Sequence, residues 1–262
     1  MSRTVIIDGD IVVYKAAEAL TQSFEVELEE DAEFLYRKIE YVRKEDGAKF
    51  IDDFIAKIKN KTKADKVCVC LSDVENFRKE INPEYKTNRP KLKPILYKWA
   101  REYIQSLQGC KIYTRPKLEA DDVIGILVTS DVIIKGDKVI WSMDKDFKTI
   151  PCKFYKELPN GKAEKLTITE KEADWWFMYQ TLKGDVIDGY KGCYKVGDAL
   201  ARKILGNVGD YNLAEMWEKV VIAYCKHGMS EEDALLNARM ARILRNTDYD
   251  FKNKEVKLWR IK

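Results

Sequence analysis

The chain has 262 residues, 45% of them hydrophobic, and its 47 basic and 44 acidic side chains leave a formal net charge of +3. A chain of this length can bury a hydrophobic core in one or two domains. Because the positive and negative charges nearly cancel, any affinity for nucleic acid must come from local basic patches. No stretch of about 18 apolar residues could span a membrane, and the opening MSRTVIIDGD turns acidic too soon for a secretory signal. We therefore expect a cytoplasmic globular protein with no membrane partner.

The cysteines and the histidine exclude several kinds of metal site. The six cysteines show no metal-ligand spacing, and Cys68 and Cys70 alternate in KVCVCL as core residues on one face of a strand do. The sequence contains one histidine, His227, in an expected turn between two helices. A single histidine cannot build a histidine-rich zinc site. If the protein is a hydrolase, its expected tools are carboxylates and water.

The first part of the chain alternates expected strands with expected helices. The strands are TVIIDG, KVCVCLSD, CKIYT and KVIWSMD, and the helices are IVVYKAAEAL, DDFIAKIKNK, ILYKWAREYIQSL and DDVIGILVTS. This alternation predicts an α/β fold with a mostly parallel central sheet that helices cover on both faces. From about residue 169 the pattern is helical, in the segments 169–185, 197–205, 214–225 and 230–245. We therefore expect an α/β core over residues 1–165 and a helical region over residues 166–262, which ends in a short strand or tail, EVKLWRIK.

Acidic residues stand where the expected strands end and, in KLEADDVIGILV, where a helix begins. They are Asp8, Asp10, Asp73, Glu119, Asp121, Asp122, Asp144 and Asp146. In open parallel sheets, ligands bind outside the carboxyl ends of the strands, and acids from separate strands would converge there. Like charges so close repel one another, and burying them without a partner is costly. A bound cation would resolve this conflict, although each acid taken singly could also be a solvated loop end or a helix cap.

The carboxylate side chains of this acidic set indicate which cation they would bind. Carboxylate oxygens select hard cations such as Mg²⁺ or Mn²⁺ over zinc or copper. The set holds more carboxylates than one Mg²⁺ usually takes, because this ion keeps several waters. Two ions about 3.5–4 Å apart, as in metal-assisted phosphoryl transfer, would use them better.

Residues 76–94, NFRKEINPEYKTNRPKLKP, form a basic segment with three of the six prolines of the chain. The basic residues are Arg78, Lys79, Lys86, Arg89, Lys91 and Lys93, with Phe77 and Tyr85 among them. The prolines exclude a continuous helix and favour disorder in the absence of a ligand. Cations that follow a phosphate backbone, with aromatic rings for stacking, suit single-stranded nucleic acid. A solvated loop is the alternative, but the position directly after Asp73 favours binding.

Residues 182–205, LKGDVIDGYKGCYKVGDALARKIL, combine glycines with basic residues. These are Gly184, Gly189, Gly192, Gly197, Lys191, Lys195, Arg202 and Lys203. A glycine-rich turn that leads into a helix presents free backbone N–H groups to an anion, usually phosphate. Asp185 and Asp188 lie nearby and could add to the acidic set. Glycine turns between helices are also common without any ligand.

Together these segments resemble the 5′-nuclease family, which comprises flap endonucleases, the 5′-nuclease domains of bacterial DNA polymerases and phage 5′→3′ exonucleases. The phage enzymes are the most similar. The resemblance rests on IIDGD, LSDVENFRKEINPEYKTNR, LEADDVIG, SMDKDFKTI and LKGDVIDGYKGCYKVG, and it extends into ADWWFMYQTLKGD, MARILRN and LWR. It implies a PIN-like α/β core and, in residues 182–205, a helix–hairpin/three-turn–helix element that grips duplex DNA and often a K⁺ ion.

The resemblance also implies roles for single residues. One metal ion would be bound by Asp8, Asp73, Glu119 and Asp121, and a second by Asp144, Asp146 and Asp185, with Asp122 and Asp188 close by. Lys86 would contact the scissile phosphate, Tyr85 would stack on the terminal base and Arg89 would bind phosphate, with Arg78 and Lys79 as further active-site cations. The other nucleic-acid contacts would come from Lys91, Lys93, Gly192, Lys195, Gly197, Arg202 and Lys203.

Two features depart from the family pattern. The hairpin commonly reads G-V-x-G-I-G, whereas here Lys195 replaces the middle glycine and Ala199 stands where a lysine is expected. These differences concern the K⁺ site and the grip on duplex DNA, not the acids. Asp10 lies outside the usual ligand set, and we expect it to cap a helix or to support a ligand.

The implied function is that of a metal-dependent 5′→3′ exonuclease in phage replication or recombination. It would degrade duplex DNA from 5′ ends and remove RNA primers from RNA–DNA hybrids as an RNase H, and 5′ flaps are a further candidate substrate. Its partners would be duplex DNA with 5′ ends, RNA–DNA hybrids and single-stranded 5′ ends, with replication proteins as candidates, in the host-cell cytoplasm if the chain is phage-encoded. Two alternatives stay open. A phosphatase of the haloacid dehalogenase type would use the Asp-x-Asp of VIIDGDIVV but leaves the basic segment and glycine turn unexplained, and the intact acids argue against a non-catalytic DNA-binding module.

Overall fold

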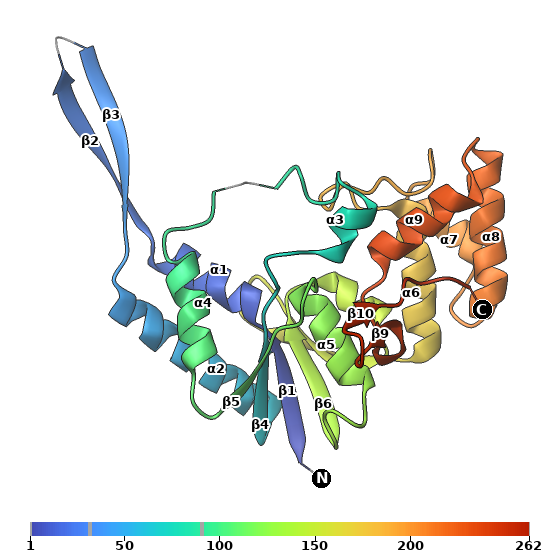
Figure 1. The fold of residues 1–262 in the computed structure, drawn as a ribbon, viewed down its shortest axis with the longest axis horizontal. Helices are drawn as coiled ribbons and strands as arrows, with labels where there is room; N and C mark the ends of the chain where they lie inside the picture. Colours follow the sequence, from blue (N-terminus) through green and yellow to red (C-terminus); the bar gives the residue numbers. More distant parts are fainter. Residues whose placement is uncertain (1, 31–32, 90–91, 262) are drawn as a thin grey trace.

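A computed structural model describes residues 2–30, 33–89 and 92–261. Its centre is a six-stranded sheet with the strand order β5-β4-β1-β6-β7-β8 (Figure 1). The strands are β1 Arg3–Asp8, β4 Lys66–Cys70, β5 Cys110–Tyr113, β6 Asp137–Ser142, β7 Cys152–Glu157 and β8 Ala163–Ile168. Neighbouring strands are parallel except β7 and β8, which are antiparallel. The mostly parallel sheet expected from the sequence is therefore confirmed.

The central strands β1 and β4 are apolar on both sides because helices cover both faces of the sheet. In β4, Cys68 and Cys70 pack into the core on one face, whereas Val67 and Val69 pack into the core on the other. This alternation confirms that both cysteines are core residues on one face of a strand.

Helices lie on each face of the sheet. On one face, α1 Gly9–Leu20, α2 Lys44–Thr62 and α4 Tyr97–Ser106 share a hydrophobic core with β1. On the other face, α5 Ala120–Thr129 and the short 3₁₀-helix η1 Lys145–Thr149 pack against β1 and β6, near the short helix α3 Phe77–Ile81. The helices expected in this half of the sequence are thus present, and α2 begins eight residues earlier than the expected segment 52–61.

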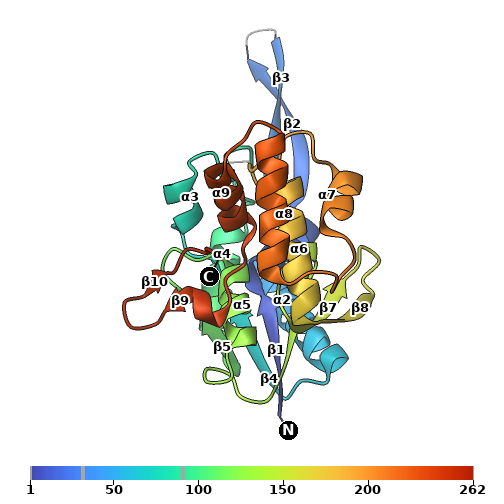
Figure 2. The ribbon, with the colours of Figure 1, turned by 90° about the vertical axis from the view of Figure 1, so that its right-hand side faces the viewer.

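The remaining helices form a second core beside the sheet (Figure 2). They are α6 Glu170–Lys183, α7 Asp198–Leu205, α8 Leu213–Lys226 and α9 Glu231–Ala241. Helices α6, α8 and α9 each begin with a capping box, in which the cap side chain and the acid three residues later satisfy each other's backbone amides. Helix α9 ends earlier than expected, because the backbone beyond Ala241 bonds to a buried ion pair described below.

Several elements were not expected. An antiparallel hairpin of β2 Gln22–Glu30 and β3 Glu33–Tyr41 projects from the body (Figure 1). Strands β7 and β8 extend the sheet, and β8 runs through residue 165, where we expected a domain boundary. Near the C-terminus, η2 Asn246–Asp248 and β9 Tyr249–Asp250 were not expected either, whereas β10 Glu255–Val256 lies where the sequence predicted a short strand or tail. None of the described helices is long and apolar enough to cross a membrane.

The strand order determines where a ligand can bind. The chain proceeds from β1 to β4 and β5 on one side and then returns to β6 on the other side of β1. Loops that leave β1 and β6 therefore diverge, and this divergence opens a crevice at the carboxyl ends of the strands. Asp8 ends β1, and Asp144 follows directly after β6.

The contact between α5 and the C-terminal segment leads to a first prediction. A Cβ atom added at Gly125 would lie 2.3 Å from the carbonyl oxygen of Leu244. Gly125→Ala should therefore destabilise the protein by about 2 kcal/mol in urea unfolding, despite the roughly 1 kcal/mol that alanine gains in a helix. At Gly197 the added Cβ meets no atom within 4 Å, and Gly197→Ala should cost clearly less. Equal stability of Gly125→Ala and the wild type would contradict this close packing.

Candidate active site

The first acids lie at the carboxyl ends of β1 and β6. Asp8 caps α1, where its Oδ1 accepts hydrogen bonds from two amides of the first turn. Asp144 caps η1 in the same way and accepts a 2.8 Å hydrogen bond from the amide of Asp146. Ser142 links the two strand ends, because its hydroxyl donates to Asp8 at 3.4 Å. The sheet and two helix starts therefore place these carboxylates side by side.

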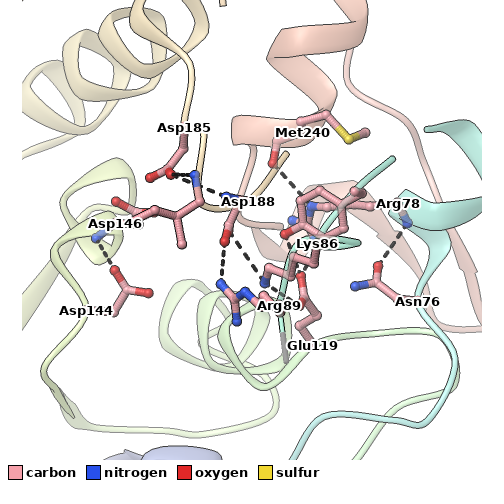
Figure 3. Close-up of polar contacts among 12 residues, drawn as sticks. Asn76, Arg78, Lys86, Arg89, Glu119, Asp144, Asp146, Asp185, Asp188 and Met240 are labelled. Atoms are coloured by element: carbon pink, nitrogen blue, oxygen red, sulfur yellow. Dashed lines mark hydrogen bonds and ion pairs between the residues drawn. The ribbon is translucent and has the colours of Figure 1, made fainter. Parts of the chain in front are cut away.

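A second acidic loop follows α6. Asp185 accepts hydrogen bonds from the amides of Ile187 and Asp188, which close a tight turn. Figure 3 shows Asp185 and Asp188 next to Asp144 and Asp146. The glycine-rich segment thus brings its acids to the end of β6, as we expected.

Glu119 and Asp121 lie at the start of α5 and belong to a third element. Glu119 accepts a 2.5 Å hydrogen bond from Lys86 Nζ, a 2.9 Å one from the hydroxyl of Tyr85 and a 3.2 Å one from Arg78. Lys86 Nζ is also 3.6 Å from Asp188. The ammonium of Lys86 therefore lies between the acids of α5 and those of the loop after α6 (Figure 3).

The acids differ in their pKa values because their partners differ. Burial, together with the charges of Asp10 and Asp144, raises the pKa of Asp8 to about 7. Burial and the charge of Asp144 likewise raise the pKa of Asp146 to about 7. Burial and the charge of Glu119 raise the pKa of Asp121 well above its usual value. Burial alone would also raise that of Glu119, but the charges of Lys86 and Arg78 outweigh it and hold the pKa at about 2.

This donor set suits a divalent cation. Within the described residues, no three acidic, cysteine or histidine side chains converge on one point as they stand. The carboxylates instead contact backbone amides, Lys86, Arg89 and Gln180, whose Nε2 donates to Asp146 at 2.6 Å. Raised pKa values show that the buried negative charge is only partly compensated, and all-oxygen donors are those that Mg²⁺ and Mn²⁺ prefer. The residues therefore fit such an ion, after small side-chain rotations.

The structure corrects two assignments on α3 and α5. Arg78 is 2% exposed, and all five of its N–H donors are used, by Asp122, by Glu119 and by the carbonyl groups of Met240 and Arg242. It has no donor left for a substrate, so it is not placed as an active-site cation. Asp122 pairs with Arg78 through both oxygens and accepts from the amide of Leu244. The carboxylate of Asp122 faces Arg78 and the Leu244 amide rather than the other acids, so it is not placed as a metal ligand.

Tyr85 also differs from its expected role. Its ring is 3% exposed and belongs to the helical core, and its hydroxyl donates to Glu119. A ring so buried has no face for a terminal base. Within the basic segment, residues 76–89 form α3 and a series of turns, and the amide of Lys86 donates to the carbonyl of Asp188.

Asp73 and Asp10 are held by partners other than the acids described above. The two oxygens of Asp73 accept 2.8 Å hydrogen bonds from the amides of Val74 and Lys117, so the structure does not turn this carboxylate toward Asp8. Asp10 pairs with Arg101 at 2.8 Å and accepts from the amide of Ser72. It therefore ties α1 to the loop after β4, and the helix cap expected of it is supplied by Asp8.

The glycine hairpin keeps the backbone that its sequence pattern requires. A Cβ at Gly184 would lie 2.4 Å from the amide nitrogen of Gly192, which itself donates to Asn237 at 2.9 Å. Lys195, which replaces a glycine, has a φ of +60° and so adopts the left-handed conformation that glycine adopts more readily. Gly197 flanks the start of α7. The substitution thus changes the side chain and leaves the turn intact.

The other residues expected to contact DNA differ in their exposure and in their partners. Arg89 pairs with Asp188 and is half-exposed. Lys79 and Lys203 are exposed, and Lys93 lies over the rings of Tyr14 and Tyr97. Arg202 lies on α7 against aromatic rings of α6. Lys91 lies outside the described residues.

Sequence reasoning missed a group of residues beside the acids. η1, β7, α6 and α7 enclose a pocket of about 270 Å³ that includes Asp146 and Asp185. Its cations and polar side chains include Lys145, Lys148, Lys156, Lys183, Trp176, Tyr179 and Gln180. The signal available in the sequence was the pair of lysines that flank Asp146 in SMDKDFKTI.

Comparison with known proteins gives a consistent result. Residues 3–172 match the family described as 5′-3′ exonuclease, N-terminal resolvase-like domain. The sequence is 32% identical to an exonuclease of Escherichia phage T7, over 98% of this chain and 93% of that protein. It is 30% identical to an exodeoxyribonuclease of Enterobacteria phage T3, over 97% of this chain and 92% of that protein.

The fold is also similar to solved structures. A variant of the bacteriophage T5 5′-exonuclease superposes with a TM-score of 0.62 at 14% identity, covering 92% of this chain and 88% of that one. A bacteriophage T5 flap endonuclease in complex with DNA and metal ions superposes with a TM-score of 0.64 at 15% identity, covering 91% and 88%. The fold class expected from the sequence is therefore confirmed.

The acid pKa values predict a pH-dependent response to metal. Asp8 and Asp146 have pKa values of about 7, above those of unfolded aspartates, so their contribution to stability is present at low pH and is lost as the pH rises through about 7. Without metal, the melting temperature should fall between about pH 4 and about pH 7 and level off above it. Protons compete with a cation for these oxygens, so saturating Mg²⁺ should raise the melting temperature by roughly 3 °C more at the higher pH.

The matched control is the double variant Asp8→Asn/Asp146→Asn, because the asparagine side chains that replace the two carboxylates do not titrate. It should show a flatter pH profile and a smaller Mg²⁺ shift in the same melts. A wild-type shift that is equal at both pH values would contradict the placement of these acids in the ion site.

The buried ion pair predicts that Arg78 is structural. Arg78→Met leaves Asp122 as a buried charge without a cation and should destabilise the protein by about 3–5 kcal/mol in urea unfolding. Arg78→Met/Asp122→Leu removes both charges and should recover most of that loss. Lys79→Met, at the exposed neighbouring position, should change stability by less than about 0.5 kcal/mol. A stable Arg78→Met protein would refute the structural role.

Proposed function

This chain belongs to the 5′-3′ exonuclease family, and we propose that it hydrolyses phosphodiester bonds at the 5′ ends of duplex DNA with two bound divalent cations. The observation that carries the proposal is that partly buried carboxylates from the ends of β1 and β6, the start of α5 and the loop after α6 lie at one edge of the sheet, with Lys86 between two of these elements. Mg²⁺ is the proposed ion, and Mn²⁺ should substitute for it, because both prefer oxygen ligands.

The acids divide into two proposed ligand sets. Asp144, Asp146 and Asp185 lie together at the end of β6 and the loop after α6 and would hold one ion. Asp8, Glu119 and Asp121 would hold the other, joined by Asp73 if its carboxylate leaves the amides of Val74 and Lys117. When bound, such ions lower the pKa of a water and offset the charge that develops on the leaving oxygen.

The cations of the basic segment would act on the substrate. Lys86 and Arg89 pair here with Glu119 and Asp188, at the position where a phosphate would meet the acids. Their donors would then neutralise the phosphoryl oxygens of the scissile bond. The backbone of Lys86 is left-handed, with a φ of +56°, and its amide donates a hydrogen bond to the carbonyl of Asp188. Both features fix the position from which the Lys86 side chain extends.

The wider DNA contacts would be made by backbone and cations. Gly192 and Gly197 lie in the hairpin, Lys195 and Lys203 are exposed beside it, and Lys79 and Lys93 lie along the basic segment. Contacts of this kind go to phosphates, so base identity should matter little. A K⁺ ion at the hairpin stays a prediction from the family resemblance.

Two further substrates belong to the proposal. Activity on 5′ flaps is supported by the similarity to the T5 flap endonuclease fold. Removal of RNA from RNA–DNA hybrids, as in primer removal during phage replication, is supported by the family resemblance alone. Both would use the same acids, because the reaction at the phosphodiester is the same.

The two alternatives receive less support. A phosphatase of the haloacid dehalogenase type needs Asp8 as a nucleophile and Asp10 as an acid. Asp8 instead holds the first turn of α1, and Asp10 is paired with Arg101. A non-catalytic module would have no reason to keep several buried carboxylates that repel one another.

A time course on 5′-labelled duplex DNA tests the proposal. Wild-type protein should release labelled mononucleotides or short oligomers with Mg²⁺ and none with EDTA. Asp144→Asn should slow release by at least about 100-fold, because an ion contributes several kcal/mol to the transition state. Asp53→Asn, at an exposed position of α2, should cleave at the wild-type rate.

Parallel lanes distinguish the substrates and the alternatives. A 5′-flap duplex and an RNA–DNA hybrid rank the three activities in the same assay. Mass spectrometry after incubation with a phosphate monoester would reveal a phosphorylated Asp8, which only a phosphatase should form. DNA that is bound but never cut, with Mg²⁺ and Mn²⁺ both present, would leave the binding module as the better description.

A further inference from the structure

A groove beside the acids is lined by cations that lie against aromatic rings. It is the pocket of about 270 Å³ between η1, β7, α6 and α7, and the carboxylates of Asp146, Asp185 and Asp198 also line it. Lys148 of η1, Lys183 of α6 and Arg202 of α7 line it together with Trp176 and Tyr179 of α6. We refer to this feature as the Lys148 groove.

Aromatic rings hold the cations of the Lys148 groove. Lys148 Nζ lies 4.7 Å from the centre of the Trp176 ring, and Lys183 Nζ lies 5.7 Å from that of Tyr179. The guanidinium of Arg202 lies 5.0 Å from the Tyr179 ring and 5.6 Å from the Trp176 ring. A ring face attracts a cation without cancelling its charge or using its N–H donors.

This arrangement contrasts with the cations at the acids. Lys86 and Arg89 are paired with carboxylates, whereas neither Lys148 nor Lys183 forms an ion pair in the part of the chain that the structure describes. Arg202 pairs with Asp198 at 3.1 Å, and both side chains are about half exposed. Lys148 and Lys183 therefore present positive charge that is positioned but not paired with a carboxylate, which is the chemistry that binds an anion.

A partly satisfied amide also lies on the same wall. Gln180 is 8% exposed, lines the groove and donates its Nε2 to Asp146. Its Oε1 is buried and has no hydrogen-bond partner within residues 2–30, 33–89 and 92–261. Buried acceptors of this kind are rare in folded proteins. A phosphodiester has no donor for this oxygen, so it is the cations and rings of the groove that indicate an anion.

We propose that the Lys148 groove binds the phosphodiester backbone of a nucleic-acid strand next to the bond that is cleaved. Lys148 and Lys183 contact phosphates of that strand, and the exposed part of the Trp176 ring lies against a sugar or base. The inference rests on the proposed function, because it takes the acids at Asp146 as the place of cleavage. Contacts to the backbone and to a ring face make the site insensitive to base sequence.

Binding without turnover tests the groove directly. Fluorescence anisotropy with a labelled 5′-flap duplex, in EDTA, compares the wild type with Lys148→Ala/Lys183→Ala. The double variant should bind about tenfold more weakly, and the slope of log affinity against log salt should fall by about two, one for each phosphate that a lysine no longer neutralises. Lys57→Ala, at an exposed position on α2 across the sheet, should match the wild type in both.

Variants of Trp176 test the aromatic support. Trp176→Phe keeps a ring face and should bind within about twofold of the wild type. Trp176→Ala removes the support of Lys148 and should bind about threefold more weakly. Thermal melts of all variants confirm that the fold is kept, since Lys148 and Lys183 lie at the surface.

The outcomes separate the groove from the proposed function. Wild-type affinity and salt slope in the double variant would refute the groove, whether or not the protein cleaves DNA. Weaker binding with a smaller slope supports the groove, even if the cleavage assay refutes the nuclease. Weaker binding with an unchanged slope would overturn the inference, because lysines that bind phosphates must release counterions.

Discussion

The ion pair of Arg78 and Asp122 is the interaction on which the rest of the site depends. Both side chains are buried, and removing two charges from water costs several kcal/mol for each ion unless every donor and acceptor is satisfied. Arg78 meets this condition with carboxylates of α5 and carbonyl groups at the end of α9. The pair therefore joins α3, α5 and α9 at one point, and the same guanidinium contacts Glu119.

The ion pair of Arg78 and Asp122, with its contact to Glu119, helps to explain why the acidic edge of the sheet is stable. Glu119 stays ionised because Arg78 and Lys86 hold its pKa at about 2. Asp8 and Asp146, which form no ion pair among the described residues, have pKa values of about 7. The cations of the chain thus compensate only part of the negative charge at this edge of the sheet. A divalent cation would supply the missing positive charge, and the basic segment would then be available to phosphate. Stability and metal binding are therefore linked through the same carboxylates.

The sequence predicted the parts of this structure that depend on local pattern. β1, β4 and β6 are apolar runs because they are buried on both faces, and the acids that follow them had to lie at one edge of the sheet. β7 and β8 were missed because their residues are half-exposed and mix charged with apolar types. The direction of a side chain is also not a local property. Arg78 and Tyr85 lie in a basic segment, yet both point inward, because partners on α5 and in the helical core satisfy them.

The same limit explains why the Lys148 groove has no signature in the sequence. Its cations come from η1, α6 and α7, and what they share is a set of aromatic neighbours on α6 rather than a spacing along the chain. The molecule thus uses two ways to hold a cation. At the acids, where charge must be balanced before a phosphate can approach, the cations are paired with carboxylates. Along the groove, where a polyanion must be attracted, they are held by ring faces, which leave their charge free to act.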